Sequence, residues 1–248
     1  SINVRDKYGY GPLHLTIKKK CYRGADVLLL YNGDINFKMS NGSTALHWAC
    51  ENNEMEIIKW LLTKDKINYN CRDKLKETPI LRAATKGNME IVEYLMKKNL
   101  VDWKMRDDKL QSLLHKAAYN GSNDLIMRIA NINPVACNGM MNEKDRDGNT
   151  PLHLAVKKDH FRAIKSLCMM GAEMNIQNKH GDTPLHIAIV LKDYKTARYL
   201  YQSGASADLK NKKGLTARLL TETQKPDAAS SKTNDSFKKN DDPSKVFL

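Results

Sequence analysis

The sequence predicts an all-α repeat solenoid of helix–turn–helix units joined by short β-turn fingers. A tetrapeptide close to Thr-Pro-Leu-His recurs at intervals of 33, 34, 34, 38, 33 and 33 residues, tight-turn residues precede most copies, and apolar helical patterns follow them. A fixed period of this length is typical of one small unit stacked several times, which offers a long concave surface and no deep pocket. The copies begin at Gly11, Thr44, Thr78, Ser112, Thr150, Thr183 and Thr216.

The repeat at 145–177 shows the physical reason for each element. Gly148 closes a tight turn, because glycine can take a positive φ. Thr150 suits a helix N-cap, and Pro151 suits the first helical position, where its missing N–H costs nothing. Apolar residues at helical spacing then predict two short helices, and Gly171 ends the second one.

Neither helix of a repeat can fold alone. Each spans about ten residues, which is below the length at which isolated helices become marginally stable in water. Each must therefore bury its apolar stripe against the next repeat, and small residues let the helices approach closely. These alanines are Ala49, Ala83, Ala84, Ala117, Ala118, Ala155 and Ala188.

The pattern resembles the ankyrin repeat, whose signature is a turn, Thr-Pro-Leu-His-x-Ala-Ala, a second helix and Gly-Ala-Asp-x-Asn. The resemblance implies an ankyrin domain over residues 1–220, with about six full repeats and a terminal partial one, and a polar tail at 221–248. It also implies protein binding on the concave side. Asn36 and Asn175 resemble asparaginyl-hydroxylation sites, although that pattern nearly coincides with the family consensus.

Some repeats depart from the signature. The third has Lys76 in place of the turn glycine and Leu81 in place of the histidine, and the fourth has Leu110 in place of the glycine. The surplus residues before the fifth repeat lie within 131–141 and are expected to form a loop. This loop is either an inert insertion or a second binding element whose methionines make adaptable contacts.

The formal net charge is +13. The tail is neutral, so the excess lies on the repeats, mostly as thinly spread lysine. Three interpretations stay open: a solvated surface, an acidic protein partner, or nucleic acid. The dispersed charge favours the first two.

The resemblance implies contacts from the finger tips and the first helices. Arginine and aromatic side chains usually dominate interface energies, so we expect the centre of a site for an acidic or mixed-charge protein segment at Trp48, Arg82, Lys116 and Tyr119. Alternatively, Trp48 packs between helices and the cations are merely solvated. The other candidate positions are Tyr8, Tyr10, Lys74, Leu75, Lys86, Lys109, Arg146, Asn149 and His180.

No catalytic motif is present: we find no GxSxG, P-loop or GxGxxG pattern. We expect no catalysis, cofactor, metal or small-molecule substrate for this chain. The repeated histidines are expected to be structural, because copies about a repeat apart cannot share a metal. They are His14, His47, His115, His153 and His186.

The chain has five cysteines, an odd number, and they are widely spaced, which favours free thiols. Free thiols in turn favour a reducing compartment, the cytoplasm or nucleus. No apolar run is long enough to cross a bilayer. We also expect the chain to be a monomer.

Both ends of the chain suggest a context. The start at 2–6 resembles the junction of two repeats, so we expect the chain to continue upstream, where a catalytic domain of a larger enzyme could lie. The end, Val246-Phe247-Leu248, follows a polar segment and resembles the export signal of effectors secreted into host cells by intracellular bacteria. Other interpretations are a eukaryotic scaffold, recognition of the C-terminus by a partner, or packing of this end onto the last repeat.

Overall fold

The computed structural model describes residues 3–223 and 246–247, and over these residues it contains α-helices and no strands. The all-α repeat architecture is therefore confirmed. The helices are α1 (Pro12–Lys18), α2 (Tyr22–Leu30), α3 (Ala45–Glu51), α4 (Met55–Leu61), α5 (Pro79–Lys86), α6 (Met89–Lys97), α7 (Leu113–Tyr119), α8 (Asn123–Ile132), α9 (Pro134–Met141), α10 (Pro151–Lys157), α11 (Phe161–Met169), α12 (Pro184–Val190), α13 (Tyr194–Gln202) and α14 (Ala217–Thr223). They fall into two compact units, Ser1–Leu113 and Leu114–Leu248.

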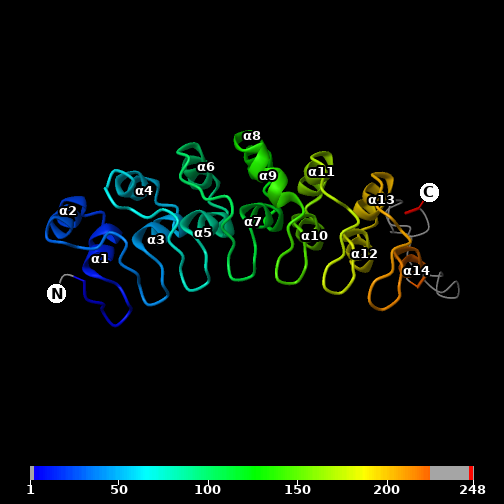
Figure 1. Ribbon diagram of the computed structural model, residues 1–248, viewed down its shortest axis with the longest axis horizontal. Helices are drawn as coiled ribbons and strands as arrows, with labels where there is room; N and C mark the ends of the chain where they lie inside the picture. Colours follow the sequence, from blue (N-terminus) through cyan, green and yellow to red (C-terminus); the bar gives the residue numbers. More distant parts are fainter. Residues whose placement is uncertain (1–2, 224–245, 248) are drawn as a thin grey trace, which may run out of the picture. The chain divides into compact units, whose positions relative to one another are not determined.

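In the N-terminal unit the first helices of the repeats, α1, α3 and α5, form one row, and the second helices, α2, α4 and α6, form another (Figure 1). Each second helix packs on the first helix of its own repeat. Leu46 of α3 and Ile58 and Leu61 of α4 are fully buried between the rows. The core is thus made by short apolar stripes that cover one another, as the helix lengths require.

The C-terminal unit repeats this arrangement. The first helices α10, α12 and α14 contact one another in sequence, and α11 and α13 pack on the first helices of their own repeats (Figure 1). Ile164 and Leu167 of α11 are fully buried, as their helical spacing predicts. Their burial confirms the stripe assigned to the second helix.

The surplus residues at 131–141 do not form a loop, so that expectation was wrong. They continue α8 and then fold as the additional helix α9, which packs against α8. The side chain of Asn133 caps α9 by accepting a hydrogen bond from the backbone N–H of Ala136 at 2.9 Å. Met140 and Met141 are buried, so they act as core residues and offer no adaptable surface contacts.

The fingers are tight turns organised by the side chain of an aspartate or an asparagine. In the fifth repeat Asp145 accepts hydrogen bonds from the backbone N–H groups of Asp147 (2.9 Å) and Asn149 (2.8 Å), and Gly148 has a φ of +78°. The backbone N–H of Lys179 in the next finger donates to the carbonyl of Asp147 at 2.9 Å. Successive fingers are therefore linked by backbone hydrogen bonds.

The recurring histidine joins the second, fourth, fifth and sixth repeats to the repeat that follows each of them. In the fifth repeat the backbone N–H of Thr150 donates to Nδ1 of His153 at 3.2 Å, so the proton is carried by Nε2. Nε2 donates to the carbonyl of Asp182 in the sixth repeat at 3.0 Å. His47 and His186 make the same pair of contacts. The structural role expected for this histidine is confirmed.

Because of these histidines, we expect the free energy of unfolding to decrease at acidic pH. Burial, and then the charge of Arg5, lowers the pKa of His14 from 6.5 to about 4, and burial also lowers the pKa of His153 to about 4. A folded-state pKa below the unfolded value makes a contribution to stability that is complete above pH 6.5 and is lost as the pH falls toward 4. We expect urea denaturation to report a loss of about 1–2 kcal/mol per histidine between about pH 7.5 and 5. His153→Gln should reduce this pH dependence, and an unchanged pH dependence would contradict the assignment.

At the end of the C-terminal unit, Val246 and Phe247 pack onto the last repeats. Val246 is fully buried, and the Phe247 ring lies 5.0 Å from the Tyr201 ring, between ring centroids. The guanidinium of Arg218 lies 5.2 Å from the centroid of the Phe247 ring. Of the interpretations of this end, packing onto the last repeat is the one that the contacts of these two residues support.

The segment expected as a polar tail begins inside a helix, because α14 extends to Thr223. The expectations for 224–245 and for Leu248 lie outside the described residues.

Candidate protein-binding surface

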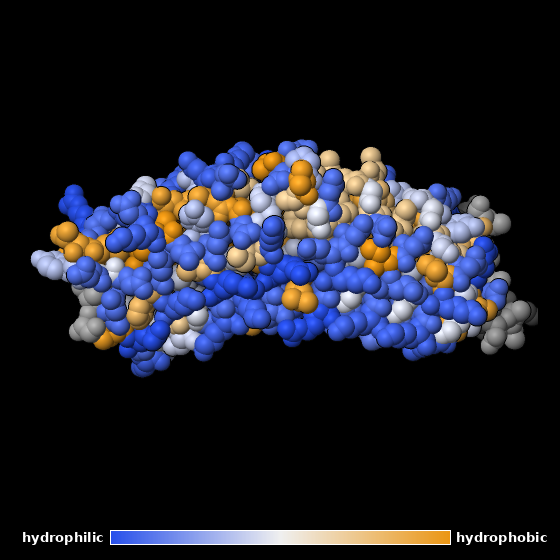
Figure 2. Space-filling view, viewed as in Figure 1, coloured by the Kyte–Doolittle hydropathy of each residue, from blue (hydrophilic) through white to orange (hydrophobic). Residues whose placement is uncertain are grey.

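The finger side of each unit is predominantly polar. In Figure 2 hydrophilic side chains cover the fingers along the lower edge of the view, and the apolar side chains along this edge occur in small separate spots. Tyr8 and Leu75 are exposed apolar residues at finger tips. Contacts with a partner on this side would therefore be mainly polar, with a few apolar anchors.

Several candidate residues of the N-terminal unit are accessible at finger tips. Tyr8, Lys74, Leu75 and Lys109 are exposed, and Tyr10 is half-buried. They lie where the resemblance implies, and their role in binding stays a prediction.

Arg82, the expected anchor of the site, is instead the centre of an ion-pair cluster within the N-terminal unit. Its guanidinium contacts Asp73, lies 2.9 Å from Glu77 and lies 3.1 Å from Glu51. The side chains of Arg82, Asp73 and Glu77 are only 12%, 0% and 7% exposed. Although burial alone would lower the pKa of Arg82, the hydrogen bond that Arg82 donates to Asp73 and the nearby carboxylates raise it. The charge of Arg82 is therefore already matched inside the chain.

The C-terminal unit contains a groove between the fingers and α12, with a volume of about 270 Å³. Val190, at the end of α12, and Leu191, which follows it, are 57% and 51% exposed and line this groove. The polar residues around them come from two fingers and α10. They are Asp147, Asn149, Lys157, Asn178, His180 and Asp182.

A family model describing ankyrin repeats matches the chain in three copies, at residues 13–107, 65–134 and 114–211. These matches span well over half of the sequence. The chain belongs to the ankyrin repeat family. Ankyrin repeats are generally protein–protein interaction modules without catalytic activity of their own, so protein binding is the general function that the family indicates.

The ankyrin repeats carry little that resembles a reactive site. Over 3–223 and 246–247 no three His, Cys, Asp or Glu side chains come together in a way that could hold a metal ion. Burial raises the pKa of the Cys168 thiol to about 11 and also raises the pKa values of Cys50, Cys71 and Cys137. These four thiols are therefore protonated and weakly nucleophilic at neutral pH.

Among the described residues, no helix combines the length and the apolar character that crossing a bilayer requires.

The expected four-residue centre is divided between the two units. Trp48 is half-buried in the N-terminal unit, where Arg82 also lies. Lys116 and Tyr119 belong to the C-terminal unit, where Lys116 is buried and Tyr119 is exposed, with the ammonium of Lys158 lying 4.5 Å from its ring centroid. A joint role for the four side chains stays a prediction.

The remaining candidates differ in accessibility. Lys86 is exposed and pairs with Glu51 at 3.0 Å, and Arg146 and His180 are exposed in the fingers of the C-terminal unit. Asn149 was expected at an accessible tip, but it is buried and its side-chain oxygen accepts a hydrogen bond from Asn178 at 3.1 Å. Asn149 therefore holds two ankyrin fingers together.

Val190 and Leu191 occupy first-helix positions on the binding side that the resemblance implies, but they were not among the candidate anchors. A signal for them was present in the sequence, because the apolar pattern of this first helix continues through both residues where earlier ankyrin repeats have polar ones, such as Lys157 and Lys158 in the fifth.

Proposed function

We propose that this ankyrin chain binds a protein partner on the side formed by the fingers and first helices, and that the groove at α12 is a principal contact. The observation that supports this proposal is the pair Val190 and Leu191, two exposed apolar side chains in a hollow with a polar rim. Adjacent exposed apolar residues rimmed by polar ones are typical of interaction sites.

The groove suits a partner segment with one apolar anchor. Burying a single aliphatic side chain contributes about 1.5–3 kcal/mol, which is enough to distinguish partners. Asp147 and Asp182 from the fingers and Lys157 from α10 offer charges of both signs to such a segment. A mixed-charge segment around an apolar residue is therefore the partner chemistry that we propose for this groove.

The test uses peptides selected from a random displayed library on the unaltered chain. We expect the selected peptides to lose about tenfold or more in affinity for V190S/L191S, because the apolar contacts are lost. The matched control is M169S, since Met169 on α11 is 79% exposed and lies outside the groove. Equal affinity of the peptides for V190S/L191S and the unaltered chain would overturn the proposal.

A further inference from the structure

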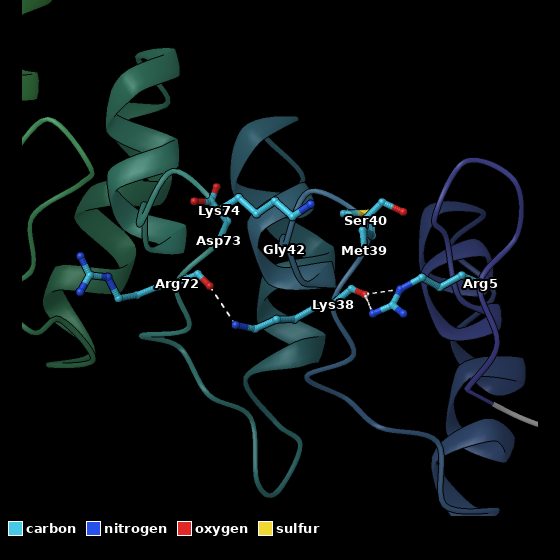
Figure 3. Close-up of a pocket in the computed structure, with 8 residues that line it drawn as sticks. All are labelled: Arg5, Lys38, Met39, Ser40, Gly42, Arg72, Asp73 and Lys74. Carbon is cyan, nitrogen blue, oxygen red and sulfur yellow. Dashed lines mark hydrogen bonds between the residues drawn. The ribbon is translucent and has the colours of Figure 1, made fainter.

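A row of basic side chains runs along the fingers of the N-terminal unit. Arg5, Lys38 and Arg72 occupy the same position in successive repeats, one residue before the finger turn. Nη2 of Arg5 donates to the carbonyl of Lys38 at 2.9 Å, and Nζ of Lys38 donates to the carbonyl of Arg72 at 2.9 Å. Figure 3 shows the three side chains in one line, each reaching toward the next finger. We call these three residues the cationic ladder.

The cationic ladder keeps its positive charge. The side chains of the ladder donate hydrogen bonds to neutral backbone carbonyls, and Nη2 of Arg72 likewise donates to the carbonyl of Arg106 at 2.6 Å. Within 3–223 none of the three cations forms an ion pair with a carboxylate. Their hydrogen bonds therefore fix the side chains in place while leaving the charges unbalanced.

A hollow of about 580 Å³ lies over the ladder. Lys74 adds a fourth cation and extends along the finger tips toward Ser40 (Figure 3). Asp73 is the acidic residue in the lining, and its carboxylate is already paired with Arg82. The lining of the hollow is therefore strongly positive, because its one carboxylate is already paired.

Two buried groups register this positive potential. The pKa of His14 is lowered first by burial and then by the charge of Arg5. Burial raises the pKa of the Cys71 thiol, and the charge of Lys38 opposes that rise. At both groups the charge of Asp34 partly offsets the effect of the cation on the pKa.

We propose that the cationic ladder binds an extended acidic polypeptide segment, with carboxylates spaced to meet successive fingers. This inference rests on the proposed protein-binding function and adds a second surface to it. A peptide is favoured over single-stranded nucleic acid because none of the residues that line the hollow is aromatic, and stacking on aromatic rings is a main source of affinity for exposed bases. In the C-terminal unit the row of equivalent positions carries less charge, because Gln177 stands between Lys144 and Lys210.

Gln177 also supplies the means of the test. Its side-chain amide donates to the carbonyl of Lys210 at 2.8 Å, so glutamine at this position keeps the bond between fingers and removes only the charge. The test variant is R5Q/K38Q/R72Q. The matched control is K19Q/K98Q/K104Q, which removes three exposed charges of the same unit away from the ladder.

The probe is a fluorescent peptide of about twelve glutamates, and its binding to the full chain is followed by anisotropy at about 50 mM NaCl, where surface charges are weakly screened. We expect R5Q/K38Q/R72Q to weaken binding about tenfold and the control variant to weaken it less than about twofold. The charge-conserving variant R5K/R72K should bind nearly as well as the unaltered chain. Urea denaturation of each variant verifies that it is folded.

Three outcomes would overturn the inference. The first is that the glutamate peptide does not bind, and the second is that both triple variants weaken its binding equally. The third is that an oligothymidine of similar length binds more tightly than the peptide and depends on the ladder in the same way. The last outcome would assign the surface to nucleic acid. Because V190S/L191S changes a groove in the other unit, failure here is distinguishable from failure of the proposed function.

Discussion

Replacing Arg82 with methionine should lower the free energy of unfolding by about 3–5 kcal/mol, because removing one partner of a buried ion pair leaves the other charge uncompensated. Here two nearly inaccessible carboxylates, those of Asp73 and Glu77, lose their counter-charge. Urea denaturation at neutral pH measures the change through the shift in the transition midpoint.

The control for this variant is Lys86→Met. Lys86 pairs with Glu51 in the same cluster, but its side chain is 49% exposed. Exposed ion pairs contribute at most about 1 kcal/mol, so K86M should change stability little. Similar losses in the two variants would contradict the structural role of Arg82. If only R82M loses much of its free energy of unfolding, then weaker partner binding by this variant could reflect unfolding, and the two effects must be measured separately.

The second large effect is expected at Gly148. A Cβ atom added there would lie 2.7 Å from the backbone nitrogen of Lys179 in the next finger, and the φ of +78° is itself unfavourable for alanine. We expect Gly148→Ala to cost about 2–4 kcal/mol, from the strained φ together with the separation of two packed fingers. Urea denaturation gives the total loss, and hydrogen exchange at the amide of Lys179 should become faster as its bond to Asp147 weakens.

Gly214 provides the matched comparison, because it has nearly the same φ, +75°, and a Cβ atom there would meet nothing within 4 Å. Gly214→Ala should therefore cost only the conformational term, about 1 kcal/mol. Equal losses in the two variants would mean that contact between neighbouring fingers contributes little to stability.

The features that the sequence predicts well depend on residues close together in the chain. The N-cap at Thr150 and its partner His153 are three residues apart, and the turn at Gly148 needs only its immediate neighbours. Such local patterns act through backbone conformation and short-range hydrogen bonds, so their meaning hardly depends on the remainder of the fold.

The features that were missed depend on how repeats stack or on competing local signals. Arg82 meets Glu51, which is 31 residues earlier in the chain, only after two first helices have packed together. The helix α9 was expected as a loop because insertions in repeats usually lie in loops, yet Asn133 followed by Pro134 is a favourable helix start. The burial of Met140 and Met141 favours the helix over the loop.

The histidine link has a consequence for how such a chain can grow. His153 reaches a carbonyl of the following repeat, and His186 reaches the equivalent carbonyl one repeat later, so donor and acceptor recur with the same spacing of 29 residues. A gene duplication that inserts one complete copy between two others would give both new junctions a matching donor and acceptor. The spacing itself can vary, because His47 reaches Glu77 over 30 residues and His115 reaches Asn149 over 34 residues, across the segment that contains α9. The length of such a protein can therefore change by whole modules, or by residues that fold away from the histidine and its acceptor.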